Sequence, residues 1–236
     1  MSLLSAEGIT AGYTALPVVR EVTVRADKGQ IVSIIGPNGS GKSTLLKAII
    51  GLLKPMTGKV TIGGSDVTGW RANRIVRQGI AYVPQTQNVF PSLSVIENLE
   101  MGAYFRDGDI KAQMEKVLSD FPDLSKGRQK KAGNLSVGQR NLLGLARALM
   151  CEPQAILVDE PTAGLAPENV NLIWAQLVAC AASGVAVVVV EQNVDMALQS
   201  SDMCYLMIAG RNKLEGPSAD MRGKDLNAIF LGHDGA

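Results

Sequence analysis

Apolar residues gather in short runs along the chain, and charged or glycine-rich segments separate one run from the next. Three runs are continuous rather than alternating: IVSII within residues 30–35, AILV at 155–158 and VAVVVV at 185–190. Continuous aliphatic runs are typical of strands that are buried on both faces of a parallel sheet. Further strands are predicted at residues 21–26, 59–62, 79–83 and 204–208.

Helical periodicity follows several of these runs. It predicts helices at residues 42–50, 137–150, 167–181 and 195–200. Strands that alternate with helices are typical of the α/β class with a mainly parallel sheet. A length of 236 residues allows one large domain with an inserted lobe.

The strand signal disappears between residues 85 and 134, where the helical segments SVIENLEMGAYF and DIKAQMEKVLSDF take its place. We therefore predict a single domain over residues 1–236. Its core covers about residues 1–85 and 139–236, and its inserted helical lobe covers about residues 86–138. The segment AGRNKLEG, residues 209–216, predicts a turn before a last helix.

Charge and composition exclude several classes of protein. Lys and Arg number 23 against 22 Asp and Glu, and this net charge of +1 argues against a general nucleic-acid-binding surface. Apolar residues make up 46% of the chain and charged residues 19%, which is typical of a folded protein. The three cysteines form no CxxC pair, so they favour a reducing compartment over a disulfide framework or a zinc site.

The ends and the apolar runs carry no membrane signal. The longest apolar run, residues 185–190, is far shorter than the roughly 20 residues that span a bilayer. The start of the chain lacks the pattern of a signal peptide. We therefore expect a cytosolic chain that can dock on a membrane partner.

The segment GPNGSGKST, residues 36–44, matches the phosphate-binding pattern G-x-x-x-x-G-K-[ST]. It lies between a predicted buried strand and a predicted helix, so backbone N–H groups and the helix N-terminus would surround a phosphate. Lys42 would reach the β- and γ-phosphates, and the Ser43 hydroxyl would ligate Mg²⁺. The predicted nucleotide-binding residues of this loop are Gly36, Pro37, Asn38, Gly39, Ser40, Gly41, Lys42, Ser43 and Thr44.

A second buried strand, in AILVDEP at residues 155–161, ends in two adjacent carboxylates. Successive strand residues point in opposite directions, so Asp159 and Glu160 are expected to have different tasks. Asp159 would hold the Mg²⁺ ion, and Glu160 would polarise the attacking water.

The segment LSVGQ, residues 135–139, lies at the start of a predicted helix and twenty residues before these carboxylates. The order of the P-loop, Gln85, LSVGQ, LVDEP and VVVVEQ resembles the ATP-binding-cassette (ABC) family, whose signature reads LSGGQ. The resemblance covers essentially the whole chain. It implies a P-loop NTPase (RecA-like) core with an antiparallel N-terminal β region and an inserted helical lobe. It also implies that the chain uses ATP and Mg²⁺.

The resemblance implies roles for further residues. Tyr13 matches the aromatic residue on which adenine stacks. Gln85 matches the glutamine that reaches the Mg²⁺ ion and the water. Ser136, Gly138 and Gln139 match signature residues that bind the ATP of the opposite subunit.

Three positions depart from the pattern of the family. Val137 replaces the first signature glycine, at a position where the side chain can point away. Ala166 replaces the usual aspartate of the following loop, and Gln192 replaces the switch histidine. The single histidine of the chain is His233, in the tail. We expect Gln192 to orient the water without titrating, which gives Glu160, Gln192 and Gln85 as the catalytic residues.

The segments YVPQ, VFPSLSVIENLEMGAY, RALM, GLAP and VEQN resemble the shorter ATP-binding subunit of branched-chain amino-acid importers. Urea and short-amide importers have similar subunits. A soluble ABC ATPase without a transport role and a nucleotide-binding module that has lost hydrolysis are two competing interpretations.

The importer resemblance also implies partners. It implies a head-to-tail dimer with a second cassette, which is either a different subunit or a second copy. It further implies integral membrane permease subunits, an indirect extracytoplasmic solute-binding protein, no nucleic acid, and a place on the inner face of the cell membrane. Val89, Phe90 and Leu93 would line the groove for a short permease helix.

Overall fold

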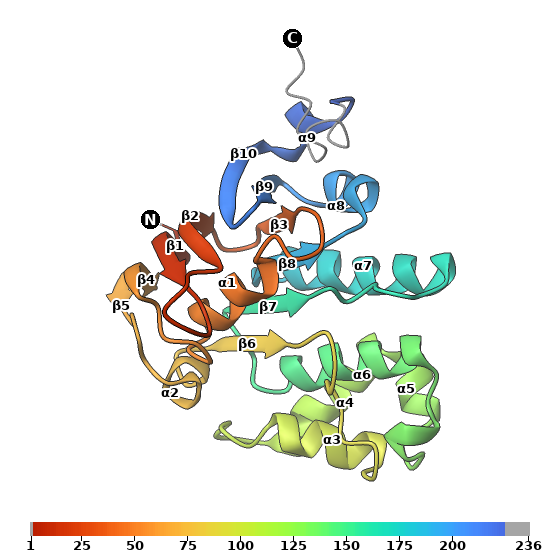
Figure 1. Ribbon diagram of the computed structural model, residues 1–236. Helices are drawn as coiled ribbons and strands as arrows, with labels where there is room; N and C mark the ends of the chain where they lie inside the picture. Colours follow the sequence, from red (N-terminus) through yellow and green to blue (C-terminus); the bar gives the residue numbers. More distant parts are fainter. Residues whose placement is uncertain (1, 225–236) are drawn as a thin grey trace.

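The computed structural model describes residues 2–224 and builds them on two β-sheets (Figure 1). The larger sheet has six strands in the order β10-β9-β3-β8-β7-β6. All neighbouring strands in it are parallel except β9 and β10. Its strands are β3 (Ile31–Ile35), β6 (Ile80–Val83), β7 (Ala155–Asp159), β8 (Ala186–Glu191), β9 (Met203–Ile208) and β10 (Arg211–Pro217).

The continuous apolar runs form β3, β8 and β7 of this sheet, and every residue of the three strands is buried. Alternate residues of β8 enter different hydrophobic clusters. Val187 and Val189 pack in one cluster, and Val188 and Val190 pack in the other. The sheet is therefore covered on both faces, which explains why these runs do not alternate with polar residues.

A smaller antiparallel sheet has the order β2-β1-β4-β5 and confirms the N-terminal β region that the family resemblance implies. Its strands are β1 (Leu4–Ala11), β2 (Val19–Ala26), β4 (Thr57–Ile62) and β5 (Ser65–Asp66). The apolar pattern does not predict β1. Gly8 interrupts this strand with a φ of 59°, and the pairing with β2 shifts register between Ala6 and Ile9.

In the described part of the chain, five helices pack around the sheets. They are α1 (Lys42–Ile49), α2 (Ala72–Val76), α7 (Pro167–Ala182), α8 (Val194–Ser200) and α9 (Ser218–Met221). Apolar residues of α1 join the cluster that lies between the two sheets, whereas those of α7 join the cluster on the other face of the larger sheet. The α/β class with a mainly parallel core sheet is thereby confirmed.

A group of helices lies beyond β6, coloured yellow to green in Figure 1. It consists of α3 (Val95–Gly102), α4 (Ile110–Asp120), α5 (Pro122–Lys126), a 3₁₀ turn at Ala132–Asn134 and α6 (Val137–Leu149). The helix α6 contacts α3, α4 and α5 on one side and β6 on the other. It therefore joins this group of helices to the larger sheet.

The prediction of a simple turn before a last helix at residues 209–216 is wrong in part. The turn is there, but β10 follows it and pairs antiparallel with β9 before α9 begins. Ala209 and Gly210 both have positive φ, at 47° and 78°, as a tight two-residue hairpin requires. Exposed and half-buried residues alternate in β10, so this edge strand has no strong apolar signal.

The Ala209–Gly210 turn contacts both sheets and the P-loop. The N–H of Arg20, on β2, donates to the carbonyl of Gly210 at 2.8 Å, and the N–H of Gly210 donates to the carbonyl of Ser40 at 3.1 Å. A Cβ atom on Gly210 would lie 2.1 Å from the carbonyl oxygen of Val18. The close approach therefore requires glycine.

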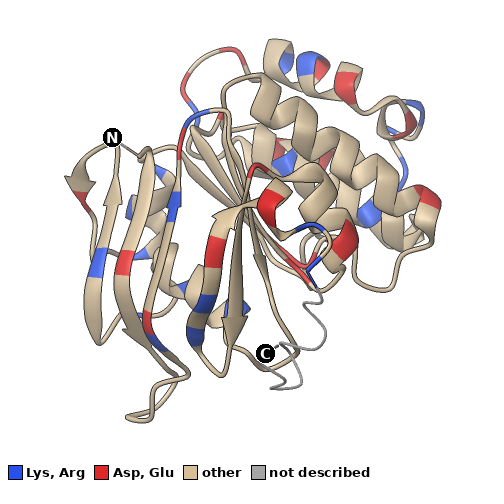
Figure 2. Ribbon diagram, turned by 90° about the horizontal axis from the view of Figure 1, so that it is seen from above, with Lys and Arg blue, Asp and Glu red and all other residues tan. Residues whose placement is uncertain are grey.

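Charges and thiols show no unusual grouping in the described residues. Lys and Arg residues lie among Asp and Glu residues over the ribbon (Figure 2). Cys151, Cys180 and Cys204 are all free, and the last two are buried. Within residues 2–224, none of the helices has the length and apolar character needed to cross a bilayer.

Candidate functional site

The P-loop connects the end of β3 to the start of α1, as the sequence predicts. Gly36 has a φ of 155°, and a Cβ there would lie 2.1 Å from the carbonyl oxygen of Met207. Gly41 precedes α1 in the left-handed conformation, and no side chain caps the first turn of the helix. The first N–H groups of α1 are therefore available to an anion.

Lys42 lies inside this loop and is only 4% exposed. Its Nζ donates to the carbonyls of Gly36 at 2.8 Å and Pro37 at 3.0 Å. Burial lowers the pKa of Lys42, against the opposing effect of nearby Glu160 and Asp159. The loop also contains a buried hydroxyl, Ser40 Oγ, without a hydrogen-bond partner in the described part of the chain.

Asp159, the last residue of β7, meets the P-loop directly. Ser43 Oγ donates to Asp159 Oδ1 at 2.8 Å, and the Tyr82 hydroxyl donates to Asp159 Oδ2 at 3.2 Å. Burial, together with neighbouring Asp159, raises the pKa of Tyr82. Tyr82 is a site residue that the sequence motifs do not indicate, although a polar aromatic residue in the otherwise apolar strand IAYV is a signal for it.

Glu160 follows Asp159 in a left-handed conformation, with a φ of 46°. Its Oε2 accepts hydrogen bonds from Gln85 Nε2 and from Gln192 Nε2, each at 2.6 Å. Gln85 follows β6 and Gln192 follows β8, the two neighbours of β7 in the sheet. The structure thus brings together three predicted residues that lie far apart in sequence.

Glu191, the last residue of β8, is a buried carboxylate that the sequence analysis did not identify. It is 2% exposed, and burial raises its pKa. Its oxygens accept hydrogen bonds from Thr162 Oγ1 at 2.8 Å and from the N–H of Gln192 at 3.2 Å. An acidic residue at the end of an all-apolar strand was the available signal. Glu191 ties the turn after Glu160 to the backbone of Gln192.

Two further asparagines connect the segment after Gln85 to the turn after Glu160. Asn88 Nδ2 donates to Asn141 Oδ1 at 2.9 Å, and Asn141 Nδ2 donates to the carbonyl of Pro161 at 2.8 Å. Because Asn141 lies on α6, this chain of hydrogen bonds passes through the helix that joins the helical group to the sheet.

Tyr13 lies in the segment between β1 and β2 with 60% of its surface exposed. Its hydroxyl accepts a hydrogen bond from Lys47 Nζ at 3.2 Å, and this nitrogen is 5.5 Å from the centre of the ring. The ring therefore stands beside α1, where a base could stack on it. Its role in binding adenine stays a prediction.

The LSVGQ segment forms the start of α6. Ser136 and Gln139 cap the helix reciprocally, since each side-chain oxygen accepts from the backbone N–H of the other residue. A Cβ on Gly138 would lie 2.7 Å from Asn169 Cγ, so this glycine allows α6 and α7 to approach closely. Val137 is 51% exposed, and its place relative to a partner's phosphate stays a prediction.

The departure at Ala166 has a local consequence. Ala166 is the N-cap residue of α7 and offers no side-chain cap. Aspartate is among the preferred N-cap residues, whereas alanine is not. The helix instead begins with Pro167 and has Glu168 in its first turn.

The three residues predicted to line a docking groove differ in exposure. Phe90 is 42% exposed, and Leu93 is half-buried. The prediction is wrong for Val89, which is 7% exposed and packs in the hydrophobic core. Val89 and the preceding Asn88 are both buried, whereas Phe90 and Pro91 are exposed, so the chain turns its side chains outward after Val89.

The family model described as "ABC transporter" matches residues 19–163, the part of the chain that contains the P-loop, LSVGQ, Asp159 and Glu160. The chain belongs to the ABC transporter family. Solved structures of ABC ATP-binding cassettes are similar to this ABC protein over nearly the full length of both chains. The chain therefore has the fold of an ABC ATPase. The resemblance that its sequence motifs indicate is confirmed.

Two curated relatives of the ABC protein are branched-chain amino acid transport ATP-binding proteins. The probable protein LivF of Archaeoglobus fulgidus is 38% identical over 90% of this chain and 91% of its own. The high-affinity protein BraG of Pseudomonas aeruginosa is 39% identical over 89% of this chain and 90% of its own.

Two solved structures show related ABC cassettes. One is the ADP conformation of a transporter cassette, with a TM-score of 0.86 and 30% identity; the match covers 98% of this chain and 95% of the other. The other is a dimeric post-hydrolysis cassette bound to ADP and phosphate, with a TM-score of 0.81, 26% identity and coverage of 91% and 98%. Cassettes of this fold bind nucleotide and form dimers.

We expect ionisation of Glu191 to destabilise the folded protein. Burial raises the pKa of this carboxyl above 4.5, its ordinary value. The folded protein therefore holds this proton more tightly than the unfolded chain does. The resulting contribution to the free energy of unfolding is fully present below the ordinary pKa and is lost as the pH rises through the folded-state pKa. Urea unfolding at a series of pH values, from below the ordinary pKa to above the folded-state pKa, measures the free energy of unfolding. As the pH rises over this range, the native chain should lose stability relative to Glu191→Gln.

Glu115→Gln is the matched control, since a hydrogen bond from Arg128 lowers the pKa of the exposed Glu115 carboxyl. The native chain should gain stability relative to this variant as the pH rises through the pKa window of Glu115. A difference between native and Glu191→Gln that stays constant with pH would contradict the assignment to Glu191.

Proposed function

We propose that this chain is the ATP-hydrolysing subunit of a membrane importer for branched-chain, hydrophobic amino acids. The observation that carries the ATPase mechanism is the convergence of Gln85 and Gln192 on one oxygen of Glu160. The solute class is supported by the two relatives, which match nine tenths of the chain.

ATP would bind with its phosphates in the P-loop. The uncapped start of α1 offers N–H groups to the phosphates. The Lys42 ammonium, now donating to loop carbonyls, lies where it can bind the β- and γ-phosphate oxygens. Tyr13 would stack on the adenine with its exposed ring.

The oxygen atoms around Ser43 fit a Mg²⁺ ion. Ser43 Oγ and Asp159 Oδ1 lie 2.8 Å apart, and Mg²⁺ prefers few protein oxygens together with phosphate and water ligands. No group of three or more His, Cys, Asp and Glu residues that could hold a metal occurs within residues 2–224, so the phosphates of ATP would complete the shell. Ser43, Asp159 and Gln85 would hold the ion, which would neutralise charge on the phosphates when bound.

Glu160 would act as the general base. Two amides hold its Oε2, so its orientation is fixed while Oε1 can accept a proton from water. The water oxygen would then attack the γ-phosphorus as the bond to the leaving ADP oxygen breaks, and the proton would pass to Glu160. Gln85 and Gln192 would orient the base and the water.

A complete site would need a second cassette. Each motif occurs once in this chain, and the hydrogen bonds of Ser136 and Gln139 described above stay within α6. Ser136, Gly138 and Gln139 would therefore bind the ATP held by the P-loop of a head-to-tail partner. A related cassette whose structure is dimeric supports this arrangement.

Import would further require integral membrane permease subunits and, indirectly, an extracytoplasmic solute-binding protein. Phe90 and Leu93 lie just after Gln85, where a cytoplasmic permease helix could dock and reach the ATP site through Asn88 and Asn141. The chain would then lie in the cytoplasm, peripheral to the inner face of the cell membrane.

Replacing Glu160 with glutamine should separate binding from hydrolysis. The amide has the shape of the carboxylate but cannot accept the proton. ATP affinity should stay near that of the native chain while turnover falls about 10²–10⁴-fold, the usual contribution of a general base. Steady-state ATPase and equilibrium nucleotide binding of the assembled complex measure the two quantities. Turnover close to the native value would exclude Glu160 as the base.

Gln192→Ala should slow hydrolysis about 10²–10³-fold with little change in ATP affinity, because it removes an oriented donor at Glu160. His233→Ala is the control and should leave turnover unchanged; His233 lies outside the described residues. If the partner cassette completes its own site with a histidine, the loss in Gln192→Ala would be partial. An inactive His233→Ala beside a fully active Gln192→Ala would overturn this assignment.

Phe90→Ala should weaken assembly with the permease, or uncouple transport, while leaving ATP binding intact. Its exposed aromatic ring is a candidate anchor, and burying such an anchor commonly contributes about 2 kcal/mol or more. Val89→Ala is the matched core control and should lower the melting temperature instead. Unchanged assembly and transport in Phe90→Ala would exclude this ring as an anchor.

A further inference from the structure

The two oxygens of the Asp159 carboxylate have different partners. Oδ1 accepts a hydrogen bond from Ser43 Oγ, on the side of the P-loop, at 2.8 Å, and Oδ2 accepts one from the Tyr82 hydroxyl at 3.2 Å. A tyrosine hydroxyl keeps its proton at neutral pH and can donate it to a carboxylate. Tyr82 therefore occupies one oxygen of a buried carboxylate and leaves the other beside Ser43, the second side chain expected to hold Mg²⁺.

The sheet and the core fix the position of this hydroxyl. Tyr82 on β6 pairs in register with Leu157 on β7, and Asp159 lies two residues after Leu157, on the same face of that strand. The Tyr82 ring packs against the hydrophobic cluster between the two sheets, which also contains Leu157. Packing therefore holds the ring while its hydroxyl reaches the end of the neighbouring strand.

The hydrogen bond at Oδ2 bears on which cation the site prefers. Mg²⁺ requires a near-octahedral shell and takes one or two carboxylates beside phosphate and water, so one oxygen of Asp159 is enough for it. Ca²⁺ is larger, accepts about six to eight oxygens and often binds both oxygens of one carboxylate. Two-oxygen binding by Asp159 would require Oδ2 to give up its bond with Tyr82, so this bond opposes Ca²⁺ more than Mg²⁺.

We propose that Tyr82 is a positioning residue that makes the nucleotide site selective for Mg²⁺ over Ca²⁺, because it keeps Oδ2 of Asp159 out of the metal shell. This inference rests on the proposed function, since it concerns the ion that would accompany ATP. It adds a residue outside the sequence motifs and gives it a task that those motifs do not specify.

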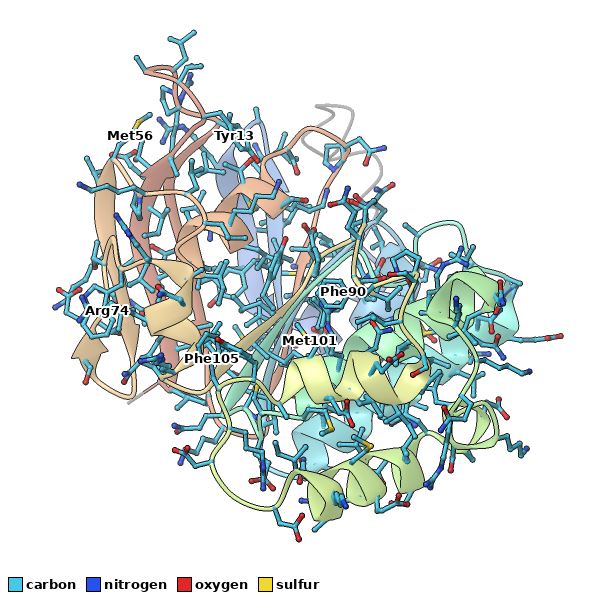
Figure 3. The ribbon with its side chains drawn as sticks, turned by 90° about the horizontal axis from the view of Figure 1, so that it is seen from below. Tyr13, Met56, Arg74, Phe90, Met101 and Phe105 are labelled. Carbon is cyan, nitrogen blue, oxygen red and sulfur yellow. The ribbon has the colours of Figure 1, made fainter. Side chains whose placement is uncertain are left out.

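The metal site is separate from the surface proposed to face the permease. Tyr13 stands beside α1, the helix that carries Ser43, and Figure 3 shows Tyr13 well apart from Phe90 and Met101. Ser43, Asp159 and Tyr82 all belong to this chain. The selectivity of the site can therefore be measured on the full-length chain without the permease.

The test is equilibrium binding of an ATP analogue whose β- and γ-phosphorus atoms are joined by an NH group, so that it is not hydrolysed. Its affinity is measured with saturating Mg²⁺, with saturating Ca²⁺ and with EDTA. Loss of a group that orients a metal ligand typically weakens metal binding about 10–100-fold, and two-oxygen binding would compensate for this loss with Ca²⁺ alone. In Tyr82→Phe the ratio of the Mg²⁺ affinity to the Ca²⁺ affinity should therefore fall at least about tenfold, while the affinity in EDTA stays at the native value.

Tyr205→Phe is the matched control. The Tyr205 ring is buried, and its hydroxyl accepts a hydrogen bond from the N–H of Arg25 at 3.2 Å, so this variant also removes a bonded tyrosine hydroxyl. Tyr205 has no contact with Asp159 of the kind that Tyr82 makes, because its bond goes to β2. The ratio of the two affinities should stay at the native value in Tyr205→Phe.

Infrared spectroscopy of the native chain tests the same contact if Tyr82→Phe fails to fold. The stretching bands of a carboxylate differ between one-oxygen and two-oxygen coordination, and isotope labelling identifies the aspartate bands. Spectra with Ca²⁺ and the analogue, minus spectra with the analogue alone, should contain no aspartate band of two-oxygen coordination. Such a band in the native chain would overturn the inference.

The binding measurement separates failure of this inference from failure of the proposed function. A native chain that does not prefer Mg²⁺ over Ca²⁺, or an unchanged ratio of affinities in Tyr82→Phe, overturns the inference alone. The same fall of the ratio in Tyr205→Phe would assign the effect to a general loss of packing and also overturn it. Absence of analogue binding by the native chain in Mg²⁺ would overturn both the proposed ATPase function and this inference.

Discussion

The strands β6, β7 and β8 run parallel side by side and end at one edge of the larger sheet, and the geometry of the candidate site depends on this alignment. One glutamine follows each outer strand, and Glu160 follows the middle strand. The two amides can therefore reach a single carboxylate oxygen from both sides. Both strands are buried over their whole length, and their register pairs Asp159 with Val190 at this edge.

Hydrogen bonds around the carboxylates extend this alignment into a network. Thr162 and the backbone of Gln192 both donate to Glu191, while Tyr82 and Ser43 both donate to Asp159. The carboxylates of Asp159, Glu160 and Glu191 thus accept hydrogen bonds from different donors, so each has its own orientation in the site. The left-handed turn at Glu160 directs its side chain away from the direction that a continued strand would give.

Local motifs were predictable from the sequence, whereas contacts between distant segments were less so. The P-loop and the pair Asp159–Glu160 depend on spacing within a few residues, so their positions could be read directly. The order of β6, β7 and β8, in contrast, is a property of the assembled sheet. The direct contact of Gln85 and Gln192 with Glu160 depends on that order, so it could not be read from the sequence. Tyr82 lies within an apolar strand and Glu191 ends one. Both were missed because each is a single polar group whose partners come from elsewhere in the fold.

Weak apolar signals explain the other differences between the elements predicted from the sequence and those in the structure. Strand β10 alternates half-buried with exposed positions at the edge of its sheet, and Gly8 breaks the periodicity of β1. Val89 was placed in the docking groove with Phe90 because their segment follows Gln85 and enters the helical lobe, but Val89 packs in the hydrophobic core. Exposure of a single apolar residue depends on the neighbouring elements, which the sequence pattern does not specify.

The Ala209–Gly210 turn has a mechanical consequence. Its backbone is bonded on one side to β2 and on the other to the P-loop, and it also ends the strand that adjoins β3. A displacement of this one hairpin would therefore disturb the nucleotide loop and both sheets together. The helices beyond β6 take no part in these hydrogen bonds; their link to the sheet passes through α6, where Asn141 bonds both Asn88 and the carbonyl of Pro161.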